Sequence, residues 1–270
     1  MRESKDTSVV AKILELQLSS YFSLGIYRMQ ALLLKSGIHI GHNKVARLMS
    51  ENALNAQIRR PRANPGFYAH RRNTVQPSRP NVLNREFHNK TPGTALVCDT
   101  TSIRCTGNQW LHLAIVAELR TGLVVSYQHS LKNDGHLVTG ALNRIRASPY
   151  FIAQPCLLHS DQGSPYTSEE YTKKAISEGF QLSYSRRGNC WDNAPAENFF
   201  SHLKAEMGIT HSKKRISALR MRNKIDHYID FYCNKRIQAR LGYKSPADYL
   251  SSFMQDRTFI NGGSSFQAAL

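Results

Sequence analysis

The order of strand-like and helical segments in the last two thirds of this chain constrains its fold most strongly. Three runs rich in Val, Ile, Leu and Thr are separated by glycine-containing turns and predict successive strands at 94–103, 109–117 and 122–129. Two shorter apolar runs predict further strands at 155–159 and 181–185. Helical spacing of apolar residues falls at 136–147, 168–179, 192–207 and 216–235. This order is typical of a mixed α/β domain with one central sheet.

Three short amphipathic segments precede this region. Apolar residues recur at helical spacing in residues 9–18, 25–37 and 42–52. The third segment carries Lys44 and Arg47 on its outer face, where we expect them to contact DNA. Two helices joined by a short glycine-containing turn have the outline of a helix-turn-helix. Other small helical bundles share this outline, so the pattern alone does not select DNA binding.

The charge excess indicates a polyanionic partner. Lys and Arg number 36 against 19 Asp and Glu, a formal net charge of +17 that nucleic acid would offset. Residues 53–80 contain six arginines, four prolines and no acid, which predicts an extended basic linker. We expect Arg59, Arg60 and Arg62 of this linker to contact DNA, although a solvated connector has the same composition.

Composition also disfavours several classes of protein. No apolar run approaches the roughly 18 residues that a membrane-spanning helix needs. The N-terminal residues form no apolar signal segment, and the five cysteines are odd in number and contain no C-x-x-C pair. We therefore expect a cytoplasmic protein without a disulfide framework or a thiolate zinc site.

Three acidic residues of this basic chain are candidates for a functional site because of where they lie in the predicted elements. Asp99 lies in the first predicted strand, Asp161 follows the strand at 155–159, and Glu197 lies in the first turn of a helix. Converging carboxylates beside a polyanion suit metal-assisted cleavage and transfer of phosphodiesters, because carboxylates and phosphate oxygens together hold Mg2+. An isolated aspartate at a strand end is usually structural, and the combination of the three acids points to catalysis.

Basic residues accompany these acids. Lys204 follows Glu197 by seven residues and therefore shares its helix face, where an ammonium group would grip a DNA phosphate. Arg186 and Arg187 lie in a glycine-containing loop just before the same helix, and we expect them to position backbone phosphates. Ordinary solvated side chains would show the same pattern.

Several sequence blocks resemble those of a known family. Residues 159–168, His-Ser-Asp-Gln-Gly-Ser-Pro-Tyr-Thr-Ser, and residues 185–200, Ser-Arg-Arg-Gly-Asn-Cys-Trp-Asp-Asn-Ala-Pro-Ala-Glu-Asn-Phe-Phe, resemble signature blocks of bacterial insertion-sequence transposases. The closest resemblance is to the OrfB product of the IS-three family, whose core is of the retroviral-integrase type. Residues 241–249, Leu-Gly-Tyr-Lys-Ser-Pro-Ala-Asp-Tyr, resemble its C-terminal block, and residues 25–54 resemble its helix-turn-helix.

The resemblance implies both a fold and a site. The fold would be a ribonuclease-H-like mixed five-stranded sheet with flanking helices, preceded by a small all-α helix-turn-helix domain. A D-D-E triad at Asp99, Asp161 and Glu197 would bind two Mg2+ ions, with Mn2+ as an alternative metal. The expected boundaries are 1–56 for the helix-turn-helix domain, 57–92 for the basic linker, 93–250 for the integrase catalytic core with its C-terminal helices, and 251–270 for a flexible tail.

The function implied by the resemblance is that of a DNA transposase subunit. Such a polynucleotidyl transferase performs metal-dependent DNA strand cleavage and strand transfer in the transposition of an insertion element. Its partners would be double-stranded DNA, at the element ends and the target, an OrfA protein or fusion, and further copies of itself, at the bacterial nucleoid. Two alternatives stay open: a catalytically inactive DNA-binding relic of a transposase, and a ribonuclease-H-type nuclease for RNA–DNA hybrids.

Overall fold

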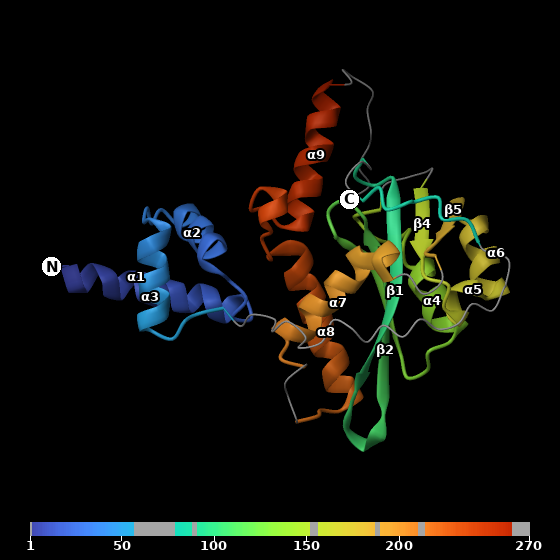
Figure 1. The fold of residues 1–270 in the computed structure, drawn as a ribbon, viewed down its shortest axis with the longest axis horizontal. Coiled ribbons are helices and arrows are strands. Elements are labelled where there is room, and N and C mark those ends of the chain that lie inside the picture. Colours follow the sequence, from blue (N-terminus) through green and yellow to red (C-terminus); the bar gives the residue numbers. More distant parts are fainter. Residues whose placement is uncertain are drawn as a thin grey trace.

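A small helical unit is followed by a larger α/β core (Figure 1). The computed structural model describes residues 2–56, 79–87, 91–151, 156–186, 190–209 and 214–260. The helical unit contains α1 (Arg2–Ser19), α2 (Ile26–Lys35) and α3 (His42–Glu51). The core contains β1 (Ala95–Arg104), β2 (Trp110–Glu118), β3 (Val124–Ser130), α4 (Gly135–Asn143), β4 (Cys156–Ser160), α5 (Ser164–Thr167), α6 (Glu169–Ser177), β5 (Phe180–Tyr184), α7 (Ala194–Glu206), α8 (Ala218–Asn234) and α9 (Pro246–Ile260). None of the described helices has the length and apolar character that crossing a membrane requires.

The helical unit has its own apolar core. Ile13 of α1, Leu33 of α2 and Val45 of α3 are fully buried in one cluster. Gly37 has a φ of +77°, which lets Ile38 donate its N–H to the Leu33 carbonyl and so ends α2. The helix α1 begins at Arg2, seven residues before the start that we expect from the sequence, because its first residues are polar and carry no apolar periodicity.

The central sheet is mixed, as the sequence predicts. Its strand order is β3-β2-β1-β4-β5. The pairs β1–β2 and β2–β3 are antiparallel, whereas β1–β4 and β4–β5 are parallel. Each of the five strands lies within a few residues of its expected position. This order places β1 and β4 side by side at the centre of the sheet.

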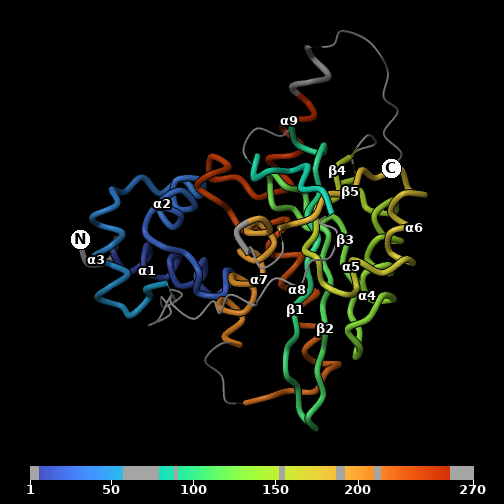
Figure 2. The backbone as a smooth tube through the Cα atoms, turned by 45° about the vertical axis from the view of Figure 1, so that its right-hand side comes forward, coloured from blue at the N-terminus to red at the C-terminus, as the bar shows by residue number. Residues whose placement is uncertain are grey.

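Helices cover both faces of the sheet (Figure 2). Alternate residues of β1 point to opposite faces, so Val97 belongs to one apolar cluster and Leu96 to the other. Phe199 of α7 and Tyr228 of α8 pack with Val97, while Tyr171 of α6 belongs to the cluster of Leu96, which also holds side chains of α4. The core therefore has three layers, and the face covered by α7 and α8 is the one that matters for the site.

Segment 79–87 packs onto the core, whereas its composition predicts part of an extended linker. The Pro80 carbonyl accepts a hydrogen bond of 3.0 Å from the Tyr184 N–H, and the fully buried Leu83 donates its N–H to Ser183 Oγ at 3.0 Å. These contacts cover β5, an edge strand with otherwise unpaired backbone groups. Residues 57–78 and 88–90 of the expected linker lie outside the described residues.

Residues 251–260 of the expected tail at 251–270 are helical. Helix α9 begins at Pro246, where Ser245 Oγ accepts a hydrogen bond from the Asp248 N–H, and it continues to Ile260. Leu250 is buried and anchors this helix to the core cluster. Residues 261–270 lie outside the described residues.

The helical unit contacts the core beside α8 (Figures 1 and 2). The Tyr21 ring packs against the rings of Tyr228 and Phe231, with centroid distances of 5.4 and 5.0 Å. Lys35 Nζ also donates to the Tyr243 carbonyl at 3.4 Å. Aromatic contacts of this kind stabilise beyond the burial of the rings themselves. Through these contacts the two units share an interface.

Candidate active site

Two of the three predicted acids come from the two central strands, Asp99 within β1 and Asp161 directly after β4. The parallel register of β1 and β4 pairs Val97 with His159. Asp99 and Asp161 each follow that pair by two residues, so both side chains point to the same face of the sheet. Val97 and Leu157, which share this alternation, belong to the cluster under α7 and α8. The backbone register thus brings the two carboxylates together.

A tight turn fixes the carboxylate of Asp161. The Gly163 N–H donates to Asp161 Oδ1 at 2.9 Å, directly after β4 ends. A Cβ atom at position 163 would lie 2.9 Å from the same oxygen, which is closer than real Cβ contacts come. Glycine at this position therefore lets the backbone approach and hold the carboxylate. On the neighbouring strand, Asp99 Oδ1 accepts a hydrogen bond of 2.8 Å from the Thr100 N–H.

The third acid, Glu197, lies in the first turn of α7. Pro195 precedes it within this turn, where the missing N–H of a proline costs nothing. Asn193 is the residue before the helix, and its Nδ2 donates to the Cys98 carbonyl at 3.2 Å. Because Cys98 is the neighbour of Asp99, this bond ties the start of α7 to the strand that carries the first aspartate.

The three carboxylates influence one another electrostatically. Burial, then the charge of Asp161 and less so that of Glu197, raise the pKa of Asp99 to about 8, against the opposing effects of the Thr100 N–H and of Lys204. Burial also raises the pKa of Asp161. The pKa of Glu197 is raised by burial and then by the charge of Asp161. A group of acids that disfavour one another's ionisation is a recurrent feature of functional sites.

An open cleft of about 770 Å³ lies over this region. Asp99 and Glu197 line it together with Lys204, the lysine that the helix spacing places on the face of Glu197. Further polar lining comes from Thr100, Thr101, Arg120, Asn198, Ser201 and Arg240. Asp161 is not part of this lining, but its charge acts on both other acids. The cleft thus combines acidic and basic groups along one wall formed by α7.

The three candidate acids offer only carboxylate oxygens. Across the described ranges, no three His, Cys, Asp or Glu side chains are close enough to form a ready metal-binding group. The charges of Asp161 and Glu197 nevertheless act on Asp99, and the charge of Asp161 acts on Glu197. Oxygen-only donors of this type suit hard cations such as Mg2+ rather than zinc or copper.

The expected DNA-contacting residues differ in their surroundings. Arg186 forms an ion pair with Asp192 at 2.9 Å. Lys44 and Arg47 lie on α3, as expected, and both pair with Asp6 of α1, at 2.5 and 3.0 Å. Arg47 also forms an ion pair with Glu51, one helical turn further along α3. The remaining expected contacts lie outside the described residues: Arg59, Arg60, Arg62 and Arg187.

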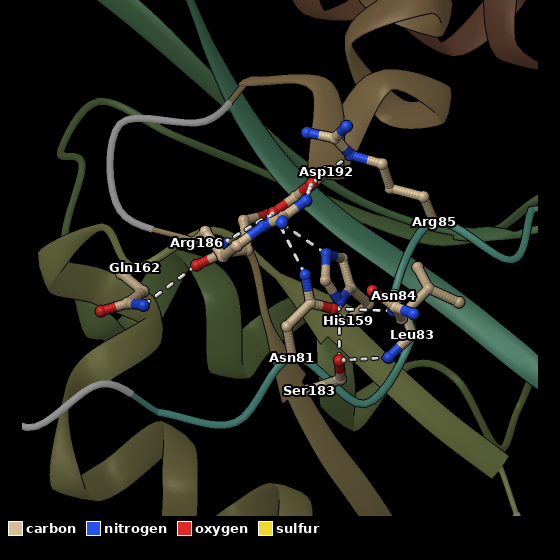
Figure 3. A network of polar contacts seen from close by, with 10 residues as sticks. Asn81, Leu83, Asn84, Arg85, His159, Gln162, Ser183, Arg186 and Asp192 are labelled. Atoms are coloured by element: carbon tan, nitrogen blue, oxygen red, sulfur yellow. Dashed lines mark hydrogen bonds and ion pairs between the residues drawn. The ribbon is translucent and has the colours of Figure 1, made fainter. Parts of the chain in front are cut away.

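One residue of this region carries more contacts than the sequence suggests. Asp192 is fully buried and receives ion pairs from Arg85 and Arg186 (Figure 3). In the sequence, Asp192 begins the predicted helix at 192–207, where an aspartate is typical of an N-terminal cap. Its position in the Trp-Asp-Asn block before Glu197 is the signal that marks it, but the partner Arg85 stands 107 residues away.

Family models match most of the chain. The model of the HTH-like domain matches residues 3–62. Two models of the integrase core domain match residues 89–190 and 197–252. These matches cover the helical unit, the strands β1 to β5 and the helices that follow.

Relatives and a solved structure agree with these matches. The chain is 31% identical to the InsK protein of insertion sequence element IS150 of Escherichia coli, across 92% of this chain and 84% of that protein. It is 33% identical to the transposase for insertion sequence element IS904 of Lactococcus lactis, across 83% of this chain and 86% of that protein. A chain of the simian T-cell lymphotropic virus intasome has the same fold, with a TM-score of 0.51, 13% identity, and coverage of 88% of this chain and 74% of that one. The protein therefore belongs to the bacterial insertion-sequence transposases of the IS-three family, which carry an integrase core domain.

Proposed function

We propose that this protein cuts one DNA strand at the end of an insertion element and joins the freed 3′-hydroxyl to another phosphodiester. The observation that carries the proposal is that Asp99 of β1 and Glu197 of α7 line one open cleft with Lys204, and that the charge of Asp161, directly after β4, acts on both of these acids. The net charge of +17 supports a polyanionic substrate. Membership of the transposases gives the reaction class, a polynucleotidyl transfer.

Asp99, Asp161 and Glu197 are the residues that would hold Mg2+, or Mn2+ in its place, and we propose two ions. The raised pKa values of these acids fit this role, because a divalent cation relieves the repulsion that otherwise opposes their ionisation. Two ions held there would supply activation of the attacking oxygen and stabilisation of the charge on the leaving oxygen.

The residues of the cleft would bind and orient the DNA. The Lys204 ammonium would hold a non-bridging phosphate oxygen, and Ser201 and Asn198 on the same helix would donate to the sugar–phosphate backbone. In cleavage, a water oxygen bonds to phosphorus while the bond to the 3′-oxygen breaks. In transfer, the oxygen of that 3′-hydroxyl bonds to the phosphorus of a second phosphodiester, and the bond from that phosphorus to its leaving oxygen breaks. Orientation of the two reactants makes a covalent enzyme intermediate unnecessary.

The helical unit would recognise the end of the element. Helix α3, with Lys44 and Arg47, would contact the DNA, and the linker arginines and the loop with Arg186 and Arg187 would follow its backbone. An OrfA protein and further copies of this chain would complete the assembly, since an element has two ends to be joined. The protein would then act at the bacterial nucleoid.

Strand transfer by purified protein tests the proposal. A duplex oligonucleotide carrying the element's end is incubated with wild type, with Glu197→Gln and with Glu169→Gln as a matched control on the exposed side of α6. Wild type and control should cleave and transfer with Mg2+, while Glu197→Gln binds the duplex but leaves it intact. If wild type shows neither reaction with Mg2+ or Mn2+, even with OrfA present, the protein is an inactive DNA-binding relic. Preferential cleavage of an RNA–DNA hybrid would favour a ribonuclease instead.

A further inference from the structure

A buried carboxylate sits at the entrance to the helix that carries Glu197. The side chain of Asp192 is fully buried, yet it accepts five hydrogen bonds. Arg186 contributes its backbone N–H, Nε and Nη2, each at 2.9 Å, so that its guanidinium grips both carboxylate oxygens. Arg85 Nε donates to Oδ1 at 2.6 Å and Asn81 Nδ2 to Oδ2 at 3.1 Å. The pKa of Asp192 is held well below its usual range by these donors.

These donors come from two separate parts of the chain (Figure 3). Arg85 and Asn81 belong to segment 79–87, which precedes the core in sequence and covers β5. Arg186 follows β5 itself. Two further hydrogen bonds support the same region. His159 Nδ1 and Ser183 Oγ are 2.8 Å apart, and Ser183 Oγ accepts a hydrogen bond from the Leu83 N–H. Asp192 therefore joins segment 79–87, the end of β5 and the start of α7 at one point.

The position of Asp192 relates this junction to the site. Asp192 directly precedes Asn193, the residue from which α7 begins, and Glu197 follows in the first turn. Asn193 is bonded to the Cys98 carbonyl of β1. Two adjacent residues thus fix the start of α7 on two sides, Asn193 to the strand of Asp99 and Asp192 to segment 79–87. A negative charge at this end of a helix is also favoured by the helix dipole.

We propose that Asp192, gripped by Arg85 and Arg186, is a positioning residue that holds Glu197 toward the two aspartates. This inference rests on the proposed function of Glu197. Since Asp192 has no access to water, it cannot release both arginines without leaving a buried unpaired charge. The junction therefore keeps the first turn of α7 in one place, and it makes that place depend on segment 79–87.

This role differs from that of a DNA contact, which is the role that the sequence suggests for Arg186. The guanidinium groups of Arg85 and Arg186 keep part of their surface open, with side chains 42% and 54% exposed. Their donors toward Asp192 are nevertheless engaged. Loss of a phosphate contact would weaken the binding of DNA, whereas loss of a positioning residue would slow the reaction of DNA that is already bound.

Steady-state strand transfer separates the two roles. We expect Asp192→Asn to lower kcat by about 100-fold, and Arg85→Gln and Arg186→Gln by about tenfold each, with the KM for DNA nearly unchanged. Arg146→Gln, which breaks an exposed ion pair with Glu178 on the far side of the core, is the matched control and should behave as wild type. Unchanged kcat in the arginine variants, or a change confined to KM, would overturn the positioning role.

Hydrogen exchange in the protein alone tests the junction without metal, DNA or turnover. In Asp192→Asn and Arg85→Gln we expect faster amide exchange in segment 79–87 and in the first turn of α7, with the exchange of α4 unchanged. Exchange at wild-type rates in both places would refute the junction. Because this readout needs no activity, an inactive wild-type protein would overturn the proposed function and leave the junction to be decided by exchange alone.

Discussion

The two sides of the candidate site are held in place by different means. Asp99 and Asp161 stand on neighbouring strands whose backbone register sets their positions. Glu197 stands on a helix whose ends are tied down by side chains: Asp192 before its first turn and Glu206 in its last. The strand side follows from local pairing, whereas the helix side depends on residues that are distant in sequence.

This difference has a consequence for mutation. A strand ladder distributes its hydrogen bonds over many residues, so that one side-chain change leaves its register intact. A helix end whose ion pairs converge on one buried carboxylate has no such reserve. Substitutions at the aspartates should therefore remove chemistry and keep the fold, and substitutions at the helix anchors should move or loosen α7.

The largest effect should come from the strand side. Asp99→Asn and Asp161→Asn should each lower strand transfer by about 1,000-fold or more, because each removes a charge from the reacting centre. Burial disfavours the ionised form of both acids, and repulsion adds to this effect at Asp99, so the neutral amides should leave the free energy of unfolding unchanged or higher. Denaturant unfolding beside strand-transfer rates measures both. A large loss of stability would show that the two side chains themselves, and not the backbone register alone, hold this part of the sheet in place.

The anchor at the far end of α7 should contribute most to stability. Glu206 and Arg236 are both buried, joined by a bond of 2.6 Å, and Tyr228 Oη donates to Glu206 at 2.9 Å. Glu206→Gln leaves the guanidinium without its counter-charge and should cost about 3 kcal/mol in the free energy of unfolding. Glu169→Gln breaks an exposed pair on α6 and should show no measurable change.

The same pair gives a pH dependence of known sign. Burial alone would raise the pKa of Glu206, but hydrogen bonds from His202 and Arg236 outweigh it and lower the pKa from 4.5 to about 2. A carboxylate with a lowered pKa stabilises the folded state above its ordinary pKa, and this contribution is lost as the pH falls toward 2. The stability difference between wild type and Glu206→Gln should therefore shrink below pH 4.5. A difference that stays constant on acidification would contradict the role of the ion pair.

A smaller effect should follow from the turn that holds Asp161. Gly163→Ala places a Cβ atom 2.9 Å from Asp161 Oδ1 and should push the carboxylate aside, lowering strand transfer by about 30-fold. Gly135→Ala meets its nearest atom at 3.4 Å, an ordinary contact, and serves as the control in the same core. Equal activity of the two variants would show that the close approach at Gly163 does not matter.

The strand side was also the part that the sequence predicts well. The apolar alternation of each strand is local, so the five strands, with Asp99 inside the first and Asp161 directly after the fourth, follow from it. The acid on the helix follows from a cap and a proline near its start. Asp192 looks like one more capping residue, because nothing in the sequence links it to Arg85 across 107 positions.

The other differences have the same origin. Segment 79–87 reads as a linker from its prolines and arginines, and only the exposed edge of β5 explains why it packs. Lys44 and Arg47 read as outward basic residues, and their pairing with Asp6 arises from the approach of α1 to α3. Contacts between distant segments leave no periodic signal in a single sequence, so composition could not reveal them.

The smallest effect should come from the basic wall of the cleft. Lys204 shares the helix of Glu197, and its charge acts on Asp99. Lys204→Gln should raise the KM for DNA by about tenfold and reduce the slope of log affinity against log salt by about one, as expected for the loss of one phosphate contact. Lys173→Gln on α6, across the sheet, loses an equal charge from an exposed pair and should leave the slope unchanged. Equal slopes for the two variants would show that DNA responds to the net charge of the protein rather than to this wall of the cleft, and the site would then lack a defined path for the strand.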